Sequence, residues 1–319
     1  MSSIDLEITM HAIRFTAYGE PAVLELAEVL VPAPGPGEAL VRVAATTFNP
    51  VDAALRAGYL QQQFPLALPH IPGIDVSGIV SEVGAGVDRS LVGVAVVAFL
   101  PMNAAGAAAE YVLVPANLLV HAPRSVSLVD AAALPSAGLT AWQGLVEHAG
   151  VYSGARVLVN GAGGGVGGFA VGLAKHFGAY VLATAGLRSQ DAVRAAGADE
   201  IIDYTRIPVT EAVREPVDVV INLVRSSATD LIALRDRIAD GGVLVSTTTP
   251  AEADSGRKVR AGNVFVRCDA QQLTHLVALL DRGVLRLDVS ERYALADLPQ
   301  VHELAARGAL RGKTVIQIV

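Results

Sequence analysis

Cysteine is almost absent from this chain: among its 319 residues, only Cys268 carries a thiol. A single cysteine cannot form an internal disulfide, and it excludes a zinc site built from several cysteines. This usage fits a reducing cytoplasm, where we expect the protein to reside. Aromatic residues are also scarce, at 5% of a chain that is 52% apolar, so alanine and valine must supply much of the core.

Positive charge is scarce as well. The formal net charge of −7 favours neither a nucleic acid nor an anionic membrane as partner. Residues 1–9 lack the basic and apolar segments of a secretory signal, and a start at Met10 fits the sequence equally well. The uncharged stretch 91–109 approaches the roughly 20 residues of a membrane helix. Glycine and proline interrupt it, so we expect a buried strand over Val94–Leu100 and no membrane span.

Two changes of pattern divide the chain. Residues 10–134 hold short strand-like runs between turn clusters, which is typical of a compact β-rich domain. From 135 to 268, strands alternate with helical segments, which predicts βαβ units around a parallel sheet. Residues 269–319 return to a helix and short β runs. We therefore predict a β-rich domain, residues 10–134 plus 269–319, split around an inserted α/β domain at 135–268.

Within the α/β part, the pattern after residue 228 predicts a helix over Thr229–Ile238. The pair Gly241–Gly242 then predicts a stop, because glycine is a common breaker of regular structure. A short strand is expected over Val243–Ser246.

The most specific motif lies in the segment 156–179. A β run ends at Asn160, a glycine-dense turn follows, and an amphipathic helix begins. Glycines let the backbone approach a pyrophosphate, and free N–H groups at a helix N-terminus attract its negative charge. Two registers fit: Gly163, Gly165 and Gly168 match GxGxxG literally, and Ala162, Gly164 and Gly167 match the variant with alanine first. We favour the second, because it starts the helix near Gly165–Val166; a tight turn without a ligand is the alternative.

The residues after the next strand predict which dinucleotide would bind. NAD-binding proteins place an acidic side chain about 20 residues on, for the ribose 2′-OH. Here the segment 183–190 reads ATAGLRSQ, and no acid occurs before Asp191. Arg188 and Ser189 stand there instead, and a cation beside a hydroxyl suits a 2′-phosphate. We expect NADP(H), the alternative for Arg188 being a solvated surface arginine.

With these residues in hand, the sequence resembles the zinc-free branch of the medium-chain dehydrogenase/reductases, the quinone oxidoreductase or zeta-crystallin-like group. The resemblance runs from Met10 to Val319. Its markers are AYG (17–19), PGPGEALVRV (34–43), FNPVD (48–52), IPGIDVSGIVSEVGAGV (71–87), AEYV (109–112), AAALPSAGLTAWQGL (131–145), NGAGGGVG (160–167), GADEIIDY (197–204) and RGKTVI (311–316). Together they are specific for the family and not for a substrate.

The resemblance implies a GroES-like catalytic domain split by a Rossmann-type domain, with the cofactor between them. It also implies a homodimer in which strands near 263–267 pair across the interface. Zinc-dependent relatives carry a cysteine early in the catalytic domain and a His–Glu pair after a glycine. Here those places read TTFNPVD and GIDVSG, so we expect no metal site.

Four residues are expected in catalysis on the same resemblance. Asn49 is expected to donate its amide N–H to a carbonyl or quinone oxygen, the alternative being a turn-former before Pro50. Asp52 is expected either to bind the nicotinamide ribose or to cap the helix 52–57. Thr140 lies where relatives meet the nicotinamide, unless its hydroxyl only bonds its own helix. Tyr59 is expected at the substrate mouth or in the core.

The predicted cofactor-binding residues follow the glycine turn and the later strands. They are Ala162, Gly163, Gly164, Gly165, Val166, Gly167, Thr184, Arg188, Ser189, Tyr204, Ser246, Phe265, Val266 and Lys313. Phe265, Val266 and Lys313 are assigned because, by the family resemblance, they lie where relatives contact the nicotinamide end of the cofactor. Arg225, where relatives often have a glycine pair, and Ala54, where some have an aromatic or lysine, are departures from the family pattern.

Two classes of function remain open at this point. The first is a zinc-independent reductase that passes a hydride from NADPH to a quinone or an α,β-unsaturated carbonyl, including enoyl reduction. The second is a dinucleotide-binding protein without turnover, a crystallin-like or regulatory module. An intact FNPVD favours the reductase.

Overall fold

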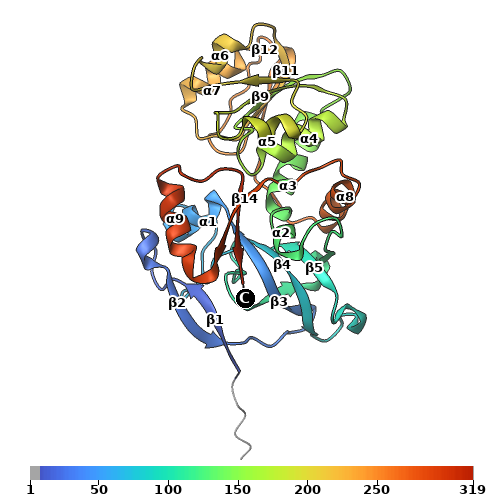
Figure 1. Ribbon diagram of the computed structural model, residues 1–319. Helices are drawn as coiled ribbons and strands as arrows, with labels where there is room; N and C mark the ends of the chain where they lie inside the picture. The colour runs from blue at the N-terminus through green and yellow to red at the C-terminus, as the bar shows by residue number, and fades with distance from the viewer. Residues whose placement is uncertain (1–7, 319) are drawn as a thin grey trace, which may run out of the picture.

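The computed structural model describes residues 8–318, and its strands gather into two large sheets at opposite ends of the molecule (Figure 1). The N-terminal and C-terminal elements lie together in the lower half of the view, and the middle of the chain forms the upper half. The chain therefore leaves one domain, builds the other, and returns. This confirms the predicted class, a β-rich GroES-like domain combined with a Rossmann-type domain.

The upper sheet has six parallel strands in the order β10-β9-β8-β11-β12-β13. They span Arg156–Asn160 (β8), Tyr180–Thr184 (β9), Glu200–Ile202 (β10), Val217–Asn222 (β11), Ile238–Ser246 (β12) and Arg260–Asn263 (β13). Counted along the chain this is the order 3-2-1-4-5-6 of doubly wound dinucleotide-binding folds. The helices of this domain are α4 (Gly167–His176), α5 (Gln190–Ala195), α6 (Val209–Ala212) and α7 (Ala228–Arg235).

Two expectations for this domain were wrong. The predicted helix to Ile238 ends at Arg235, and β12 already begins at Ile238, so the strand passes through Gly241–Gly242 instead of starting after them. The pair permits this because Gly241 has a φ of +82° and a Cβ on Gly242 would strike the Asp218 carbonyl. The strand expected near 263–267 lies at 260–263, as the edge strand β13.

The lower sheet is mostly antiparallel and has the order β14-β15-β3-β4-β5-β7, with β6 also paired to β3. Its strands are β3 (Glu38–Phe48), β4 (Asp75–Val83), β5 (Ala95–Phe99), β6 (Tyr111–Pro115), β7 (Val120–His121), β14 (Val289–Ala294) and β15 (Lys313–Gln317). A hairpin of β1 (Thr9–Arg14) and β2 (Glu25–Leu30) lies beside it, with helices α1 (Pro50–Arg56), α2 (Leu128–Ala131) and α9 (Leu298–Ala306). The last strand, β15, pairs antiparallel with the end of β3, which closes the split domain.

The buried strand expected over Val94–Leu100 is confirmed as β5, whose residues from Val96 onward are buried. Among residues 8–318, none of the helices has the length and apolar character needed to cross a bilayer.

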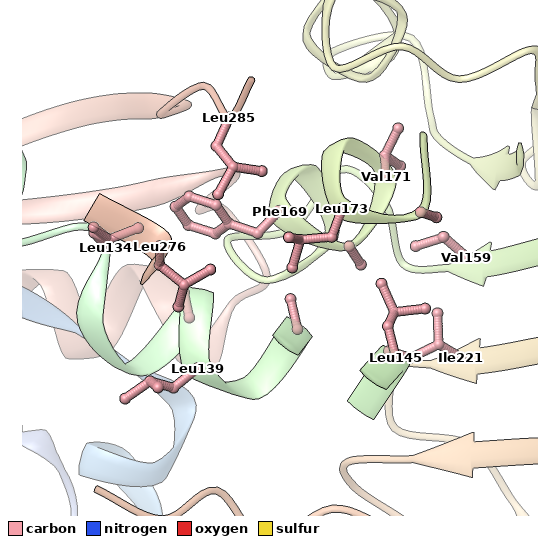
Figure 2. Close-up of a cluster of buried hydrophobic side chains, with 14 of the residues drawn as sticks. Leu134, Leu139, Leu145, Val159, Phe169, Val171, Leu173, Ile221, Leu276 and Leu285 are labelled. Carbon is pink, nitrogen blue, oxygen red and sulfur yellow. The ribbon is translucent and has the colours of Figure 1, made fainter. Parts of the chain in front are cut away.

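A continuous apolar core joins the two halves. Helix α3 (Pro135–Trp142) continues into a π-helical turn, Gln143–Ala149, and packs against α4 and α8 (Ala270–Asp281). Figure 2 shows Phe169 and Leu173 of α4 close to Leu276 and Leu285, with Leu145 beside Ile221 of β11. Leu134 belongs to this core and Cys268 packs against it. Because the core is continuous across both residues, the domain boundaries expected at 134/135 and 268/269 stay predictions.

Candidate cofactor and acceptor site

The glycine-dense turn lies between the carboxyl end of β8 and the start of α4, as the sequence predicts. It is packed too tightly for most side chains. A Cβ on Gly163 would lie less than 3.0 Å from the Ser189 hydroxyl, and one on Gly165 would strike the Lys313 side chain. Only glycine fits at these two positions, and a turn rich in glycine is what lets backbone N–H groups approach a pyrophosphate.

The packing favours one of the two registers of the motif. A Cβ on Gly167 would lie within 2.5 Å of three backbone atoms of Ala162, so this glycine is required for the helix to pack on the strand. A Cβ on Gly168 would meet nothing within 4 Å. Helix α4 begins at Gly167, with Val166 at its N-cap. The arrangement Ala162, Gly164, Gly167 therefore matches the structural demands of the motif.

Polar side chains line the carboxyl ends of four neighbouring strands. Thr184 Oγ1 accepts the Gly161 N–H at 2.8 Å and donates to Asn160 Oδ1 at 3.1 Å. Asn160 Nδ2 donates to Asn222 Oδ1 at 2.8 Å, and Asn222 Nδ2 donates to Ser246 Oγ at 3.4 Å. This row lies at the edge where ligands bind in doubly wound sheets. Thr184 and Ser246 were predicted there, and Asn160 and Asn222 were not.

Arg188, Ser189 and Tyr204 lie around one turn after β9. Arg188 is exposed and donates to the Ala309 carbonyl at 3.4 Å, and within residues 8–318 its other guanidinium N–H groups have no acceptor. Ser189 stands at the N-cap of α5, but its hydroxyl donates to the Gly186 carbonyl at 3.2 Å instead of capping the helix. The Tyr204 phenol lies over Gly186. A cation, a hydroxyl and an exposed aromatic ring thus surround this turn.

A second polar group lies on the other side of the glycine turn, where β3 ends and β4, β15 and α3 begin. We call it the lysine cluster: Thr47, Asn49, Asp75, Ser136 and Lys313. The Lys313 ammonium donates to Asn49 Oδ1 at 2.7 Å and to Thr47 Oγ1 at 2.9 Å, and it lies 3.4 Å from Asp75 Oδ2. All five residues are buried. The stem of Lys313 covers Gly165, so the cluster is adjacent to the phosphate turn.

Of the four predicted catalytic residues, only Asn49 belongs to the lysine cluster. Both N–H groups of the Asn49 amide already have acceptors, Asp75 Oδ2 at 2.9 Å and Thr47 Oγ1 at 3.2 Å. Thr140 Oγ1 donates to the Ser136 carbonyl four residues back at 2.7 Å, which is its helix-internal alternative. Tyr59 is 75% exposed just beyond α1, so it is not a core residue.

Asp52 is used as a helix cap. One carboxylate oxygen accepts the Asn49 N–H at 3.0 Å and the other accepts the Gly73 N–H at 3.2 Å. Burial raises the pKa of this carboxyl to about 7, the neighbouring Asp75 adds to the rise, and the two backbone donors oppose it. The side chain is 3% exposed, and it shares no hydrogen bond with Lys313.

Phe265 and Val266 follow β13 at the junction of the two domains. The Phe265 ring is exposed and stacks on Phe64 of the catalytic domain, with ring centroids 5.3 Å apart and planes 15° apart. Val266 packs against the shared core. An aromatic pair therefore bridges the domains, a contact that the sequence did not predict.

Within residues 8–318, no three histidine, cysteine, aspartate or glutamate side chains come together as a metal site would need. The two places where zinc-dependent relatives carry ligands contribute Asn49 and Asp75 to the lysine cluster, and a lysine ammonium lies between them. The residues present do not fit a zinc ion.

Three members of the lysine cluster escaped the sequence analysis. Asp75 and Ser136 lie inside the family markers 71–87 and 131–145, and Thr47 lies just before the marker FNPVD. The sequence signal that could have revealed the cluster was Asp75, a charged residue inside an otherwise apolar and β-branched run. Buried carboxylates are rare unless they are paired, so Asp75 implied a buried partner.

Two family models match the chain: the alcohol dehydrogenase GroES-like domain at residues 35–124 and the zinc-binding dehydrogenase at 196–316. A chloroplastic quinone oxidoreductase of Triphysaria versicolor is 32% identical over 97% of this chain and 98% of that protein. The solved quinone oxidoreductase from Coxiella burnetii has a TM-score of 0.89 and 31% identity, covering 98% of this chain and 100% of that one. A solved NAD-dependent alcohol dehydrogenase has a TM-score of 0.89 and 30% identity, covering 97% and 100%.

Proposed function

Because the chain belongs to the medium-chain dehydrogenase/reductases, in their zinc-free quinone oxidoreductase group, we propose that it transfers a hydride from NADPH to a quinone or an α,β-unsaturated carbonyl. The observation that supports the proposal is the position of two features relative to each other. The glycine turn 161–165 and the lysine cluster are adjacent, so a dinucleotide on the turn has a buried polar cluster within reach of its reactive end. Once bound, NADPH supplies the hydride.

The choice of NADPH rests on this chain's own residues, since one of the similar structures is described as NAD-dependent. The turn after β9 offers the Arg188 guanidinium and the exposed Tyr204 ring, and no carboxylate precedes Asp191. The Ser189 hydroxyl joins them if it turns from the Gly186 carbonyl to the phosphate. A 2′-phosphate gains charge-assisted hydrogen bonds from such a set, whereas a ribose 2′-OH lacks its usual acidic partner.

The test of the cofactor is a fluorescence titration of the purified protein with NADPH and NADH. We expect NADPH to bind more tightly, and Arg188→Ala to weaken NADPH by about 10- to 100-fold, since a hydrogen bond to a charged group contributes about 1.5–3 kcal/mol. NADH affinity should stay within about twofold. Arg194→Ala is the matched control, because Arg194 lies on the following helix and pairs with Asp191.

Equal losses of NADPH and NADH in Arg188→Ala would remove Arg188 from 2′-phosphate recognition. Failure of the wild-type protein to bind either nucleotide would make the glycine turn a purely structural feature and would end the proposal.

One observation favours the second candidate, a dinucleotide-binding protein without turnover. Asn49, the predicted donor to the acceptor oxygen, has both N–H groups occupied inside the lysine cluster. Oxidation of NADPH in the presence of menadione or methyl vinyl ketone, measured against a protein-free control, separates the two candidates. The two acceptors also distinguish quinone from enone reduction. A homodimer and a cytoplasmic location stay predictions.

A further inference from the structure

The lysine cluster brings a cation to the two stretches in which zinc-dependent relatives would carry their ligands. The stretches TTFNPVD and GIDVSG, which lack the zinc ligands, supply Asn49, Thr47 and Asp75 to one ammonium group. Lys313 comes from the far end of the chain, at the start of β15, and is 5% exposed. A buried ammonium is costly unless it is paired and hydrogen-bonded, so its place here is specified by the surrounding oxygens.

The ammonium also decides how the neighbouring amide is oriented. Lysine can only donate hydrogen bonds, so the Asn49 atom 2.7 Å from it must be the oxygen. The amide nitrogen then points to Asp75 and Thr47, at 2.9 and 3.2 Å. Ser136 Oγ lies 3.2 Å from the same amide oxygen. Both polar atoms of the Asn49 side chain are thereby committed to the cluster, and the amide has no N–H left for a substrate.

One of the three N–H groups of Lys313 is held less firmly than the others. Asp75 Oδ2 already accepts from Thr47 at 2.6 Å, from Ser136 at 2.7 Å and from Asn49 at 2.9 Å. The Lys313 contact to this oxygen is the longest, at 3.4 Å. Because Asp75 is satisfied by closer donors, this N–H can turn to another oxygen at little cost.

The lysine is anchored next to the cofactor turn. The Gly312 N–H donates to the Gly163 carbonyl at 3.1 Å, and the methylenes of Lys313 cover Gly165. These contacts hold the ammonium in the catalytic domain while its stem touches the Rossmann domain. A rigid support of this kind is what a preorganised electrostatic group requires.

We propose that the Lys313 ammonium binds the oxygen of the acceptor. The inference rests on the proposed function. Two-electron reduction of a quinone or enone by hydride leaves one negative charge on that oxygen, as a phenolate or enolate. The ammonium balances this charge, and a proton from water then gives the neutral product.

The first experiment compares Lys313→Met with the wild type. Methionine keeps the length and removes the charge. We expect kcat with menadione to fall by about 10²- to 10³-fold, as for other fixed donors to a developing oxyanion. The Kd of NADPH should change far less than kcat, because methionine keeps the apolar stem that covers Gly165. Lys175→Met is the control, because Lys175 pairs with Asp199 on the Rossmann domain. Wild-type kcat in a folded Lys313→Met protein would overturn the proposal.

A second variant covers the case in which Lys313→Met fails to fold because Asp75 loses its cation. In Asp75→Asn and in the double variant Asp75→Asn/Lys313→Met, position 75 is uncharged. Neither protein therefore leaves a buried carboxylate without a cation at this position. We expect the double variant to be at least about 100-fold slower than Asp75→Asn alone, because only it lacks the ammonium. Equal rates would show that Lys313 only balances the charge of Asp75, and would overturn the proposal.

A third measurement does not depend on turnover. Bound para-nitrophenol reports a fixed cation, because an adjacent positive charge lowers the pKa of a phenol by about 1–3 units. We expect this shift, read from the phenolate absorbance with NADP⁺ present, in the wild type and its loss in Lys313→Met. An equal shift in both proteins would overturn the role of Lys313. If the wild type reduces neither acceptor, the proposed function fails, and this shift still tests the lysine.

Discussion

The two adjacent glycines at the start of α4 give the sharpest test of the cofactor turn. Gly167→Ala places a Cβ within 2.5 Å of three backbone atoms of Ala162, whereas Gly168→Ala places one in open space. Both residues lie in the first turn of the same helix and undergo the same chemical change. Any difference between the variants therefore reports the packing of β8 against α4.

The expected effects have opposite signs. Backbone atoms cannot move aside as a flexible side chain does, so Gly167→Ala should cost about 1–3 kcal/mol, as other overpacked sites do. Gly168→Ala should stabilise the protein by about 0.4–1 kcal/mol, since alanine favours the helix and restricts the unfolded chain. For a chain of this size these values correspond to a Tm lower by about 2–10 °C and higher by about 1–3 °C.

The assays are thermal unfolding and the NADPH fluorescence titration. We expect Gly168→Ala to bind NADPH like the wild type and Gly167→Ala to bind it weakly, because the displaced helix would no longer present its N-terminus to the pyrophosphate. A stable, fully binding Gly167→Ala protein would refute the packing argument. Loss of binding only in Gly168→Ala would instead support the literal register of Gly163, Gly165 and Gly168.

Two further predictions concern buried polar groups. Asn49→Ala should lower kcat by about 10- to 100-fold, because Lys313 loses its shortest acceptor and its ammonium is no longer held in place; NADPH affinity should not change, and wild-type turnover would remove Asn49 from the mechanism. His302 makes the protein acid-sensitive: burial, and secondly Arg56, lower its pKa from 6.5 to about 3, so between these values the unfolded chain binds a proton that the folded protein does not. Stability should therefore fall as the pH drops below 6.5, by about 2 kcal/mol at pH 5. Urea unfolding of His302→Gln at pH 8 and pH 5 should show a correspondingly smaller loss, and an unchanged loss would assign the effect to other groups.

The sequence alone predicted the features that depend on neighbouring residues in the chain. Alternating strands and helices indicated the parallel sheet, and the order strand, glycines, helix indicated the phosphate turn. Local patterns were misleading where a glycine pair had a role other than ending an element. Gly241–Gly242 looked like a stop, but the pair lies in an irregular part of β12, where the register against β11 shifts between Ile238 and Val243. Pairing on both sides of this irregularity keeps the segment one strand.

The lysine cluster was decided only by the tertiary structure. Its members lie at positions 47, 49, 75, 136 and 313, and no periodicity links residues so far apart. They meet because β15 returns to pair with the end of β3, beside the start of β4 and α3. The sequence could show that zinc ligands were missing, because that is a statement about residue types at known places. It could not show that an ammonium from the last strand lies between those places, because long-range sheet pairing determines which buried charges become neighbours.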